Sequence, residues 1–255
     1  MNTIAHSPIT LITGGSRGLG RDMALAVADK GHDVVITYRS RSDEADAVVA
    51  LVQARGRRAA ALALDVADAA GFAGFAERLR ATLSEWGRDR LDHLVNNAGI
   101  GLHAPFADTT EAAFDELVAV HLKGPFFLTQ TLLPLLADGG RILNVSSGLT
   151  RFSLPGYAAY AAMKGAIEVL SRYQAKELGA RGITVNTLAP GAIETDFGGG
   201  AVRDDKGINA ALAAQTALGR VGLPGDIGGV VALLLDPASH WVTAQRIEAS
   251  GGMFV

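Results

Sequence analysis

Short apolar runs alternate with helix-length amphipathic segments along the chain. Residues 8–13 form the first apolar run, and a glycine-rich turn and a helical pattern over residues 21–30 follow it. A β-branched run at residues 33–38 then precedes residues 42–55, whose apolar positions recur at the spacing of one helix face. Further apolar runs occur at residues 59–64, 91–96, 141–146, 183–188 and 246–249, with a helical pattern over 226–235 before the last.

This alternation is typical of parallel strands joined by crossover helices. No proline-rich linker, composition break or internal repeat divides the sequence. The pattern predicts an α/β fold: one Rossmann-like, doubly wound domain over residues 1–255, with about seven parallel strands and helices on both faces. The glycine-rich stretch near position 200 predicts a mobile loop over about residues 194–216.

Composition excludes several classes of protein. The 255 residues carry 23 Lys and Arg against 26 Asp and Glu, a net charge of −3 that argues against a nucleic-acid partner. Without cysteine, the chain has no disulfide framework or cysteine nucleophile, and its histidines at 6, 32, 93 and 240 lack metal-ligand spacing. No apolar run approaches the ~18 residues of a membrane span, and the first ten residues lack a secretory signal. We expect a cytoplasmic protein with no metal and no membrane partner.

The glycine-rich turn TGGSRGLG at residues 13–20 is a candidate phosphate site. Gly14, Gly18 and Gly20 stand where a strand turns into a helix, and residues without Cβ let a bound group approach the backbone while the helix N–H groups favour an anion. The spacing departs from the commoner dinucleotide fingerprint, and a purely structural turn is the alternative. The same residues also match a hydrolase nucleophile elbow at Ser16, although too little chain precedes Ser16 to supply the usual oxyanion-hole strand.

The end of the second predicted strand bears on the choice of nucleotide. A site for NAD would place an acidic residue there, but the sequence has Arg39 and Ser40, while Asp43 and Glu44 belong to the first turn of the next helix. Arg39 and Arg17 could clamp a 2′-phosphate, which favours NADP over NAD; two solvated surface arginines are the alternative.

Tyr160 and Lys164 are four residues apart on a predicted helix and therefore share one face. A neighbouring ammonium lowers the pKa of a phenol, so we expect Lys164 to adapt Tyr160 for proton transfer. Ser147 ends the preceding apolar run, at the sheet edge where ligands bind, and its hydroxyl could hold a substrate oxygen. Taken alone, Ser147 is more typical of a turn or helix cap.

From about residue 9 to residue 252, the sequence resembles the short-chain dehydrogenase/reductase family. The turn at 13–20 resembles its cofactor turn, Asp-Val at 65–66 its adenine contact, NNAG at 96–99 its segment of the same sequence, and PGAIET at 190–195 its PGxxxT segment. Ser147 precedes Tyr160 by the thirteen residues that separate the family's catalytic pair. The cofactor residues that these patterns imply are Gly14, Ser16, Arg17, Gly18, Leu19, Gly20, Arg39, Ser40, Asp65, Val66, Asn97, Ala98, Gly99, Tyr160, Lys164, Pro190, Gly191, Ile193 and Thr195.

The resemblance implies hydride transfer between a nicotinamide and a carbonyl carbon. Tyr160 would exchange the proton on the oxygen, Ser147 would orient that oxygen, and Lys164 would bind the nicotinamide ribose and lower the Tyr160 pKa. The family usually has an asparagine where this chain has His121. That asparagine acts through its backbone carbonyl, so we expect retained activity, with a changed pH dependence because imidazole titrates near 6.5. A packed helix histidine is the alternative.

Mostly apolar residues are expected to rim the substrate pocket: Ile100, His103, Leu149, Phe152, Leu154, Tyr157, Ile193 and Phe197. They favour a small or medium hydrophobic carbonyl or alcohol as the substrate, covered by the loop at 194–216. Relatives that reduce 3-oxoacyl groups on carrier protein have basic residues before the catalytic strand and after the catalytic helix; here Asp138 lies in the first region and Lys176 and Arg181 in the second. A carrier-protein reductase and a non-catalytic NADP-binding regulator therefore remain alternatives. The resemblance also implies a homotetramer.

Overall fold

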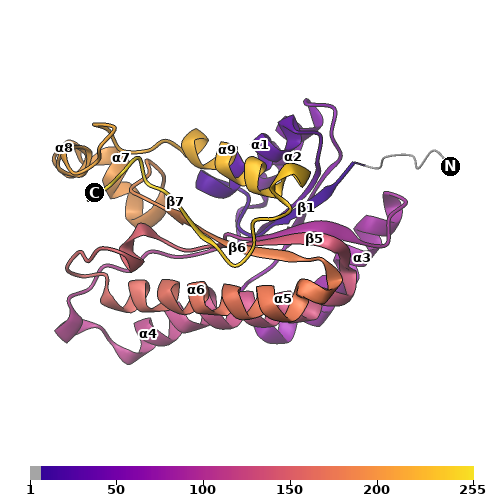
Figure 1. Cartoon of the computed structure of the whole chain (residues 1–255), viewed down its shortest axis with the longest axis horizontal. Helices are drawn as coiled ribbons and strands as arrows, with labels where there is room; N and C mark the ends of the chain where they lie inside the picture. The colour runs from indigo at the N-terminus through magenta and orange to yellow at the C-terminus, as the bar shows by residue number, and fades with distance from the viewer. Residues whose placement is uncertain (1–6) are drawn as a thin grey trace.

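The computed structural model describes residues 7–255; the expectations for residues 1–6, namely the leader, His6 and the start of the domain, lie outside that range. Seven parallel strands form one sheet in the order β3-β2-β1-β4-β5-β6-β7 (Figure 1). The strands are β1 (Ile9–Ile12), β2 (Asp33–Tyr38), β3 (Ala59–Ala63), β4 (Leu91–Asn96), β5 (Leu136–Val145), β6 (Thr184–Pro190) and β7 (Arg246–Ala249). The predicted fold class is confirmed.

Helices cover both faces of the sheet (Figure 1). One layer holds α1 (Gly18–Asp29), α2 (Ser42–Gln53) and α9 (Pro224–Leu235). The other holds α3 (Phe72–Glu85), α4 (Glu111–Val118), α5 (Gly124–Leu132) and α6 (Ala158–Leu178), with a π-helical turn at Ala119–Lys123 between α4 and α5. Each layer buries its own apolar cluster against the sheet. Since both faces of the sheet are covered, its strands consist mostly of apolar residues.

The strand order fixes where a ligand can bind. β1 lies between β2 and β4, so the connections after β1 and β4 leave the sheet toward opposite faces. Ligands of open parallel sheets bind in the crevice that this divergence creates at the carboxyl ends of the strands. The glycine turn after β1 and the NNAG segment after β4 both lie at that edge.

The segment predicted as a loop over about residues 194–216 is mostly helical. It contains a 3-10 turn at Phe197–Gly200 and two short helices, α7 (Ala201–Asp204) and α8 (Lys206–Ala214). The three glycines of the turn have positive φ, so they serve to reverse the chain before α7. The predicted mobility stays a prediction. Within residues 7–255, no helix combines the length and the apolar character of a membrane span.

Candidate active site

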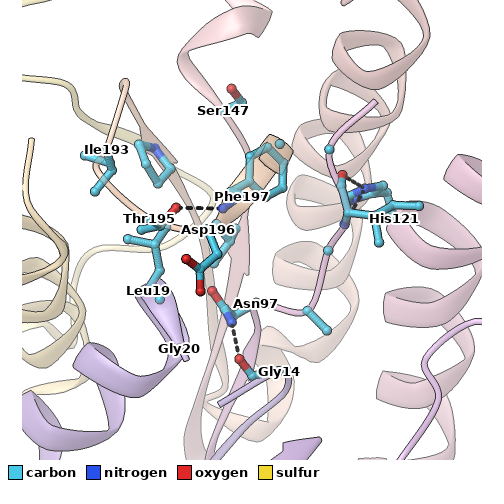
Figure 2. A pocket seen from close by; sticks show the side chains of 18 of the residues that line it. Gly14, Leu19, Gly20, Asn97, His121, Ser147, Ile193, Thr195, Asp196 and Phe197 are labelled. Atoms are coloured by element: carbon cyan, nitrogen blue, oxygen red, sulfur yellow. Dashed lines mark hydrogen bonds between the residues drawn. The ribbon is translucent and has the colours of Figure 1, made fainter. Parts of the chain in front are cut away.

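One cavity of about 620 Å³ opens at the carboxyl edge of the sheet. Its lining includes every cofactor and catalytic residue that the sequence predicts, from the glycine turn through Arg39 and Asp65 to Ser147, His121, Tyr160, Lys164 and Thr195. Figure 2 shows Gly14, Leu19 and Gly20 toward one end of the view and Ser147 toward the other, with Thr195, Asp196 and Phe197 between them. Segments far apart in the sequence therefore converge on one cleft.

The glycine turn leaves room for a bound group. Gly14 and Gly18 have φ values of 65° and 52°, which residues with a Cβ rarely adopt. A Cβ at Gly20 would lie 2.2 Å from the Gly14 carbonyl oxygen and 2.7 Å from Asn97 Nδ2. The Arg17 side chain does not cap α1, so the first N–H groups of this helix keep their capacity to bind an anion. These features fit a dinucleotide pyrophosphate.

Hydrogen bonds fix the NNAG segment against the glycine turn. Asn97 Nδ2 donates to the carbonyl oxygens of Thr13 and Gly14, at 2.8 and 3.2 Å (Figure 2). The Thr13 hydroxyl oxygen accepts from the backbone N–H groups of Asn97 and Ala98, each at 3.0 Å. The predicted cofactor segments after β1 and β4 thus form one rigid wall.

The end of β2 carries positive charge without a carboxylate ribose ligand. Arg39 and Ser40 are exposed and line the cavity, whereas Asp43 and Glu44 occupy the first turn of α2, as predicted. Arg17 Nη1 lies 3.8 Å from Asp196 in the segment before α7. Because Arg39 is exposed and lines the cavity, it is available to a 2′-phosphate, and this arrangement favours NADP over NAD.

Ser147, Tyr160 and Lys164 meet on one wall of the cavity. Tyr160 and Lys164 are buried on α6, with Lys164 Nζ 5.6 Å from the centre of the Tyr160 ring, and Ser147 lies just after β5. Lys164 Nζ donates to the Val145 carbonyl oxygen at 2.8 Å. The helix thus presents both side chains to the cleft, as the spacing of four residues predicts.

The ionisation of this pair differs from the expectation. Burial raises the pKa of Tyr160 above its usual value, and a hydrogen bond with Ser147 lowers it only in part; Lys164 is not among the causes. Burial also lowers the pKa of Lys164 to about 7, so its ammonium is itself penalised. The prediction that Lys164 lowers the Tyr160 pKa stays a prediction, and burial of both groups acts in the opposite direction.

His121 lies on the π-helical turn and is buried against Tyr160. Its Nε2 is 2.9 Å from the Ile100 carbonyl oxygen, and its ring meets the Tyr160 ring edge-on with centres 5.3 Å apart. Burial, and then the charge of Lys164, lower the pKa of His121 to about 3. The expected titration near 6.5 is therefore wrong, since the imidazole stays neutral. Figure 2 shows its contact with the segment after β4.

The end of the cavity beyond Ser147 is mostly apolar. Seven of the eight predicted rim residues line it; His103 instead lines an adjoining groove of about 400 Å³, beside Phe106 and Ala161. Leu149, Leu154 and Tyr157 line both spaces. Sequence reasoning did not name several other lining residues, among them Asp196, Val202, Leu212 and Met253. The first three lie in the segment 194–216 that was predicted to cover the substrate, whereas no local pattern pointed to Met253.

The structure also weighs against two alternatives. No hydrogen bond joins Ser16 to a histidine in the part of the chain that the structure describes, so the hydrolase interpretation lacks its general base. Arg181 Nε donates to Asp138 at 2.7 Å, and its Nη1 donates to the Leu133 carbonyl oxygen. Of the two basic residues of the carrier-protein interpretation, Arg181 is therefore already paired, whereas Lys176 is exposed.

Known proteins resemble this chain over nearly its whole length. The profile of a family described as enoyl-(acyl carrier protein) reductase matches residues 14–254. An uncharacterized oxidoreductase of Methylorubrum extorquens is 39% identical over 96% of this chain and 97% of its own. The promiscuous reductase LugOII, which catalyses keto-reduction at C1 during lugdunomycin biosynthesis, superposes with a TM-score of 0.93 at 38% identity, over 99% of this chain and 100% of LugOII. The angucycline C-6 ketoreductase LanV, with bound NADP, gives 0.92 at 36% identity, over 97% and 95%.

Proposed function

Because the chain belongs to the short-chain dehydrogenase/reductase family, we propose that it is an NADP(H)-dependent ketoreductase in which Tyr160 exchanges a proton with the carbonyl oxygen. The substrate is a small or medium hydrophobic ketone or aldehyde, or the matching alcohol in the reverse direction. The observation that carries the proposal is the convergence of Ser147, Tyr160 and Lys164 on the cavity that the glycine turn also lines.

NADP(H) fits the residues present. The glycine turn and the start of α1 would hold the pyrophosphate, Arg39 and Arg17 the 2′-phosphate, and Asp65 with Val66 the adenine end. When bound, the cofactor supplies the hydride. Thr195 and Ile193, after β6, would line its nicotinamide half.

Three side chains would manage the proton and the carbonyl oxygen. The raised pKa keeps the Tyr160 phenol protonated at neutral pH, which is the state a proton donor in carbonyl reduction requires. The Ser147 hydroxyl would donate to the oxygen as negative charge develops there. Lys164, whose Nζ reaches the cleft wall, would donate to ribose hydroxyls. The neutral His121 would hold Ile100 in place rather than transfer a proton.

The pocket favours a free hydrophobic ketone over a carrier-bound one. Apolar and aromatic side chains enclose its far end, and the adjoining groove beside His103 offers space for the distal part of a larger ring or chain. The description of the matching family keeps a carrier-protein substrate as the second candidate. The ion pair between Arg181 and Asp138 weighs against it.

A homotetramer in the cytoplasm is the proposed assembly and location. Exposed apolar side chains occur on the outer helices α4, α5 and α6: Phe114, Phe126, Phe127, Val169 and Tyr173. Apolar groups that gather on an outer surface are typical of a contact between subunits.

Ketone reduction by the purified protein tests the proposal. A series of ketones and aldehydes of increasing size would be assayed with NADPH and with NADH, on the wild type, Tyr160→Phe and the control Tyr173→Phe, which alters an exposed tyrosine of the same helix. We expect NADPH-dependent reduction that Tyr160→Phe lowers by at least about 100-fold, since the proton donor is lost. NADPH binding without turnover would identify a regulator instead, and full activity of Tyr160→Phe would exclude the proposed mechanism.

A further inference from the structure

A carboxylate outside the predicted catalytic set collects three hydrogen bonds behind Ser147. Glu168 lies one helical turn after Lys164 on α6. Its Oε1 accepts from the Ser146 hydroxyl at 2.8 Å, the Thr150 hydroxyl at 2.7 Å and Arg246 Nε at 2.8 Å. These donors come from the end of β5, the turn that follows it, and β7. Glu168 therefore links three segments to the helix that carries Tyr160.

Thr150 and Arg246 also contact the backbone of Ser147. Its carbonyl oxygen accepts from Arg246 Nη2 at 3.3 Å and lies 3.0 Å from the Thr150 hydroxyl oxygen, whose one proton is shared with the closer Glu168. Its own hydroxyl oxygen accepts from the Leu149 N–H at 3.2 Å, which caps the short turn after β5. The position of Ser147 thus depends on Arg246, which lies 99 residues further along the chain.

Beyond Arg246 the network reaches the C-terminal segment. Arg246 Nη1 donates to Glu248 at 2.8 Å, and Arg151 donates to the same carboxylate at 2.6 and 2.8 Å. The Arg151 guanidinium, before the other donors, lowers the pKa of Glu248 to about 2, so the carboxylate stays ionised at neutral pH. The Ser250 hydroxyl donates to Glu248 at 2.6 Å. An aspartate at position 250 would instead place a second negative charge beside Glu248.

We propose that Glu168 and Arg246 are positioning residues for carbonyl reduction: together they fix the Ser147 turn relative to α6, so that the Ser147 hydroxyl and the Tyr160 phenol face one carbonyl oxygen. The inference rests on the proposed function. Ser147 lies on a turn and Tyr160 on a helix, so without cross-links their separation would vary as the two elements shift. A misplacement of about 1 Å can cost about 100-fold in rate, which makes such a cross-link effective.

The partial burial of the network gives it strength. The Glu168 and Arg246 side chains are only 15% and 24% exposed, so water competes weakly for their hydrogen bonds. One carboxylate oxygen with three donors also resists rotation more than a single ion pair does. Glu168 and Arg246 are therefore suited to fixing the orientation of the Ser147 turn relative to α6, and not only to holding the two elements together.

Steady-state kinetics on Arg246→Met, Arg246→Lys and Glu168→Gln test the proposal, with Glu177→Gln as a control at an exposed carboxylate of the same helix. We expect Arg246→Met to lower kcat for ketone reduction at least about tenfold, with the KM for NADPH within about twofold of the wild type. Arg246→Lys should recover part of the loss because it restores the charge. Glu168→Gln, which keeps the shape and an acceptor oxygen, should lose less than Arg246→Met.

The pH profile separates positioning from simple stability. If the Ser147 hydroxyl moves away from Tyr160, the surroundings of the phenol change, so the pH profile of kcat in Arg246→Met should differ from those of the wild type and the control. Equal kcat values for Glu168→Gln, Arg246→Met and the control would overturn the inference, as would a KM for NADPH that rises as much as kcat falls. Should Arg246→Met not fold, Glu168→Gln with its pH profile decides. If Tyr160→Phe retains full activity, the proposed function itself fails, whatever these variants do.

Discussion

At the scale of single residues, burial decides the chemistry of the cleft. Tyr160 and Lys164 are both removed from water, and each is therefore driven toward its neutral form. A protonated phenol is ready to give its proton, while a lysine with a pKa of about 7 is only partly charged in the protein without cofactor. His121, on the other side of Tyr160, is neutral for the same reason. Negatively charged or hydroxyl-rich groups of a bound ligand would stabilise the protonated form of Lys164.

The buried lysine makes the stability of the cofactor-free protein depend on pH. Its pKa is lowered from 10.5 when exposed to about 7 when folded, so between these values the unfolded chain binds a proton that the folded chain lacks. Raising the pH from 7 toward 10 should therefore stabilise the fold through this group, by up to about 1.4 kcal/mol per pH unit. Below pH 7 Lys164 is protonated in the folded protein as well, so the full free-energy cost of burying its charge lowers the stability.

Thermal unfolding of the wild type and Lys164→Met between pH 6.5 and 9.5 measures this effect. We expect Lys164→Met to be the more stable at pH 7, with a flatter dependence of Tm on pH. Parallel curves for the two proteins would show that Lys164 remains charged in the fold.

At the scale of elements, the π-helical turn and the NNAG segment are fitted to each other. The turn directs His121 toward Ile100, and the ring lies so close that a Cβ at Gly99 would be 2.8 Å from His121 Cε1. Gly99 has no positive φ, so space alone demands a glycine there. The larger imidazole, in place of the family's asparagine, therefore constrains the neighbouring segment.

A double-mutant cycle tests this fit. Gly99→Ala should destabilise the protein by about 1–3 kcal/mol, because the added methyl overpacks a buried site. In a His121→Asn background, where the side chain is shorter, the same change should cost clearly less. Urea unfolding of the four proteins gives the coupling free energy, and additive effects would mean that the ring and the glycine do not constrain each other.

At the scale of the whole molecule, the cleft and the exposed apolar side chains of the helices lie in different places. The cleft lies at the carboxyl ends of the strands, whereas exposed apolar side chains occur on α5 and α6. These two helices belong to one of the layers that cover the sheet (Figure 1). Tyr173 and Val169 on α6 are 65% and 45% exposed. Association through these helices would leave the cleft open to substrate.

Solution mass tests the proposed homotetramer. The wild type should have about four times its chain mass of 26.4 kDa, and a Val169→Glu, Tyr173→Glu double variant should shift toward the single chain, because each subunit would bury two unpaired carboxylates at the contact. Light scattering after size exclusion gives both masses. A wild type at 26.4 kDa would exclude the tetramer.

Much of the site could be predicted because its motifs are local. The glycine turn, the NNAG segment and the spacing of Tyr160 and Lys164 are short patterns whose geometry follows from one turn or one helix. Arg246 carried no such signal, since its role arises from a contact with Ser147 in a different strand connection. Met253 likewise reaches the cavity only through the path of the C-terminal segment.

Hydrophobic period and motif spacing are properties of the chain, so the succession of strands and helices along it and the groups available for proton and hydride transfer follow from the residues alone. The ionisation of Tyr160, Lys164 and His121 and the contacts that hold Ser147 follow instead from how the elements pack. Those depend on exclusion of water and on neighbours brought from distant segments, and neither is encoded at any single position along the chain.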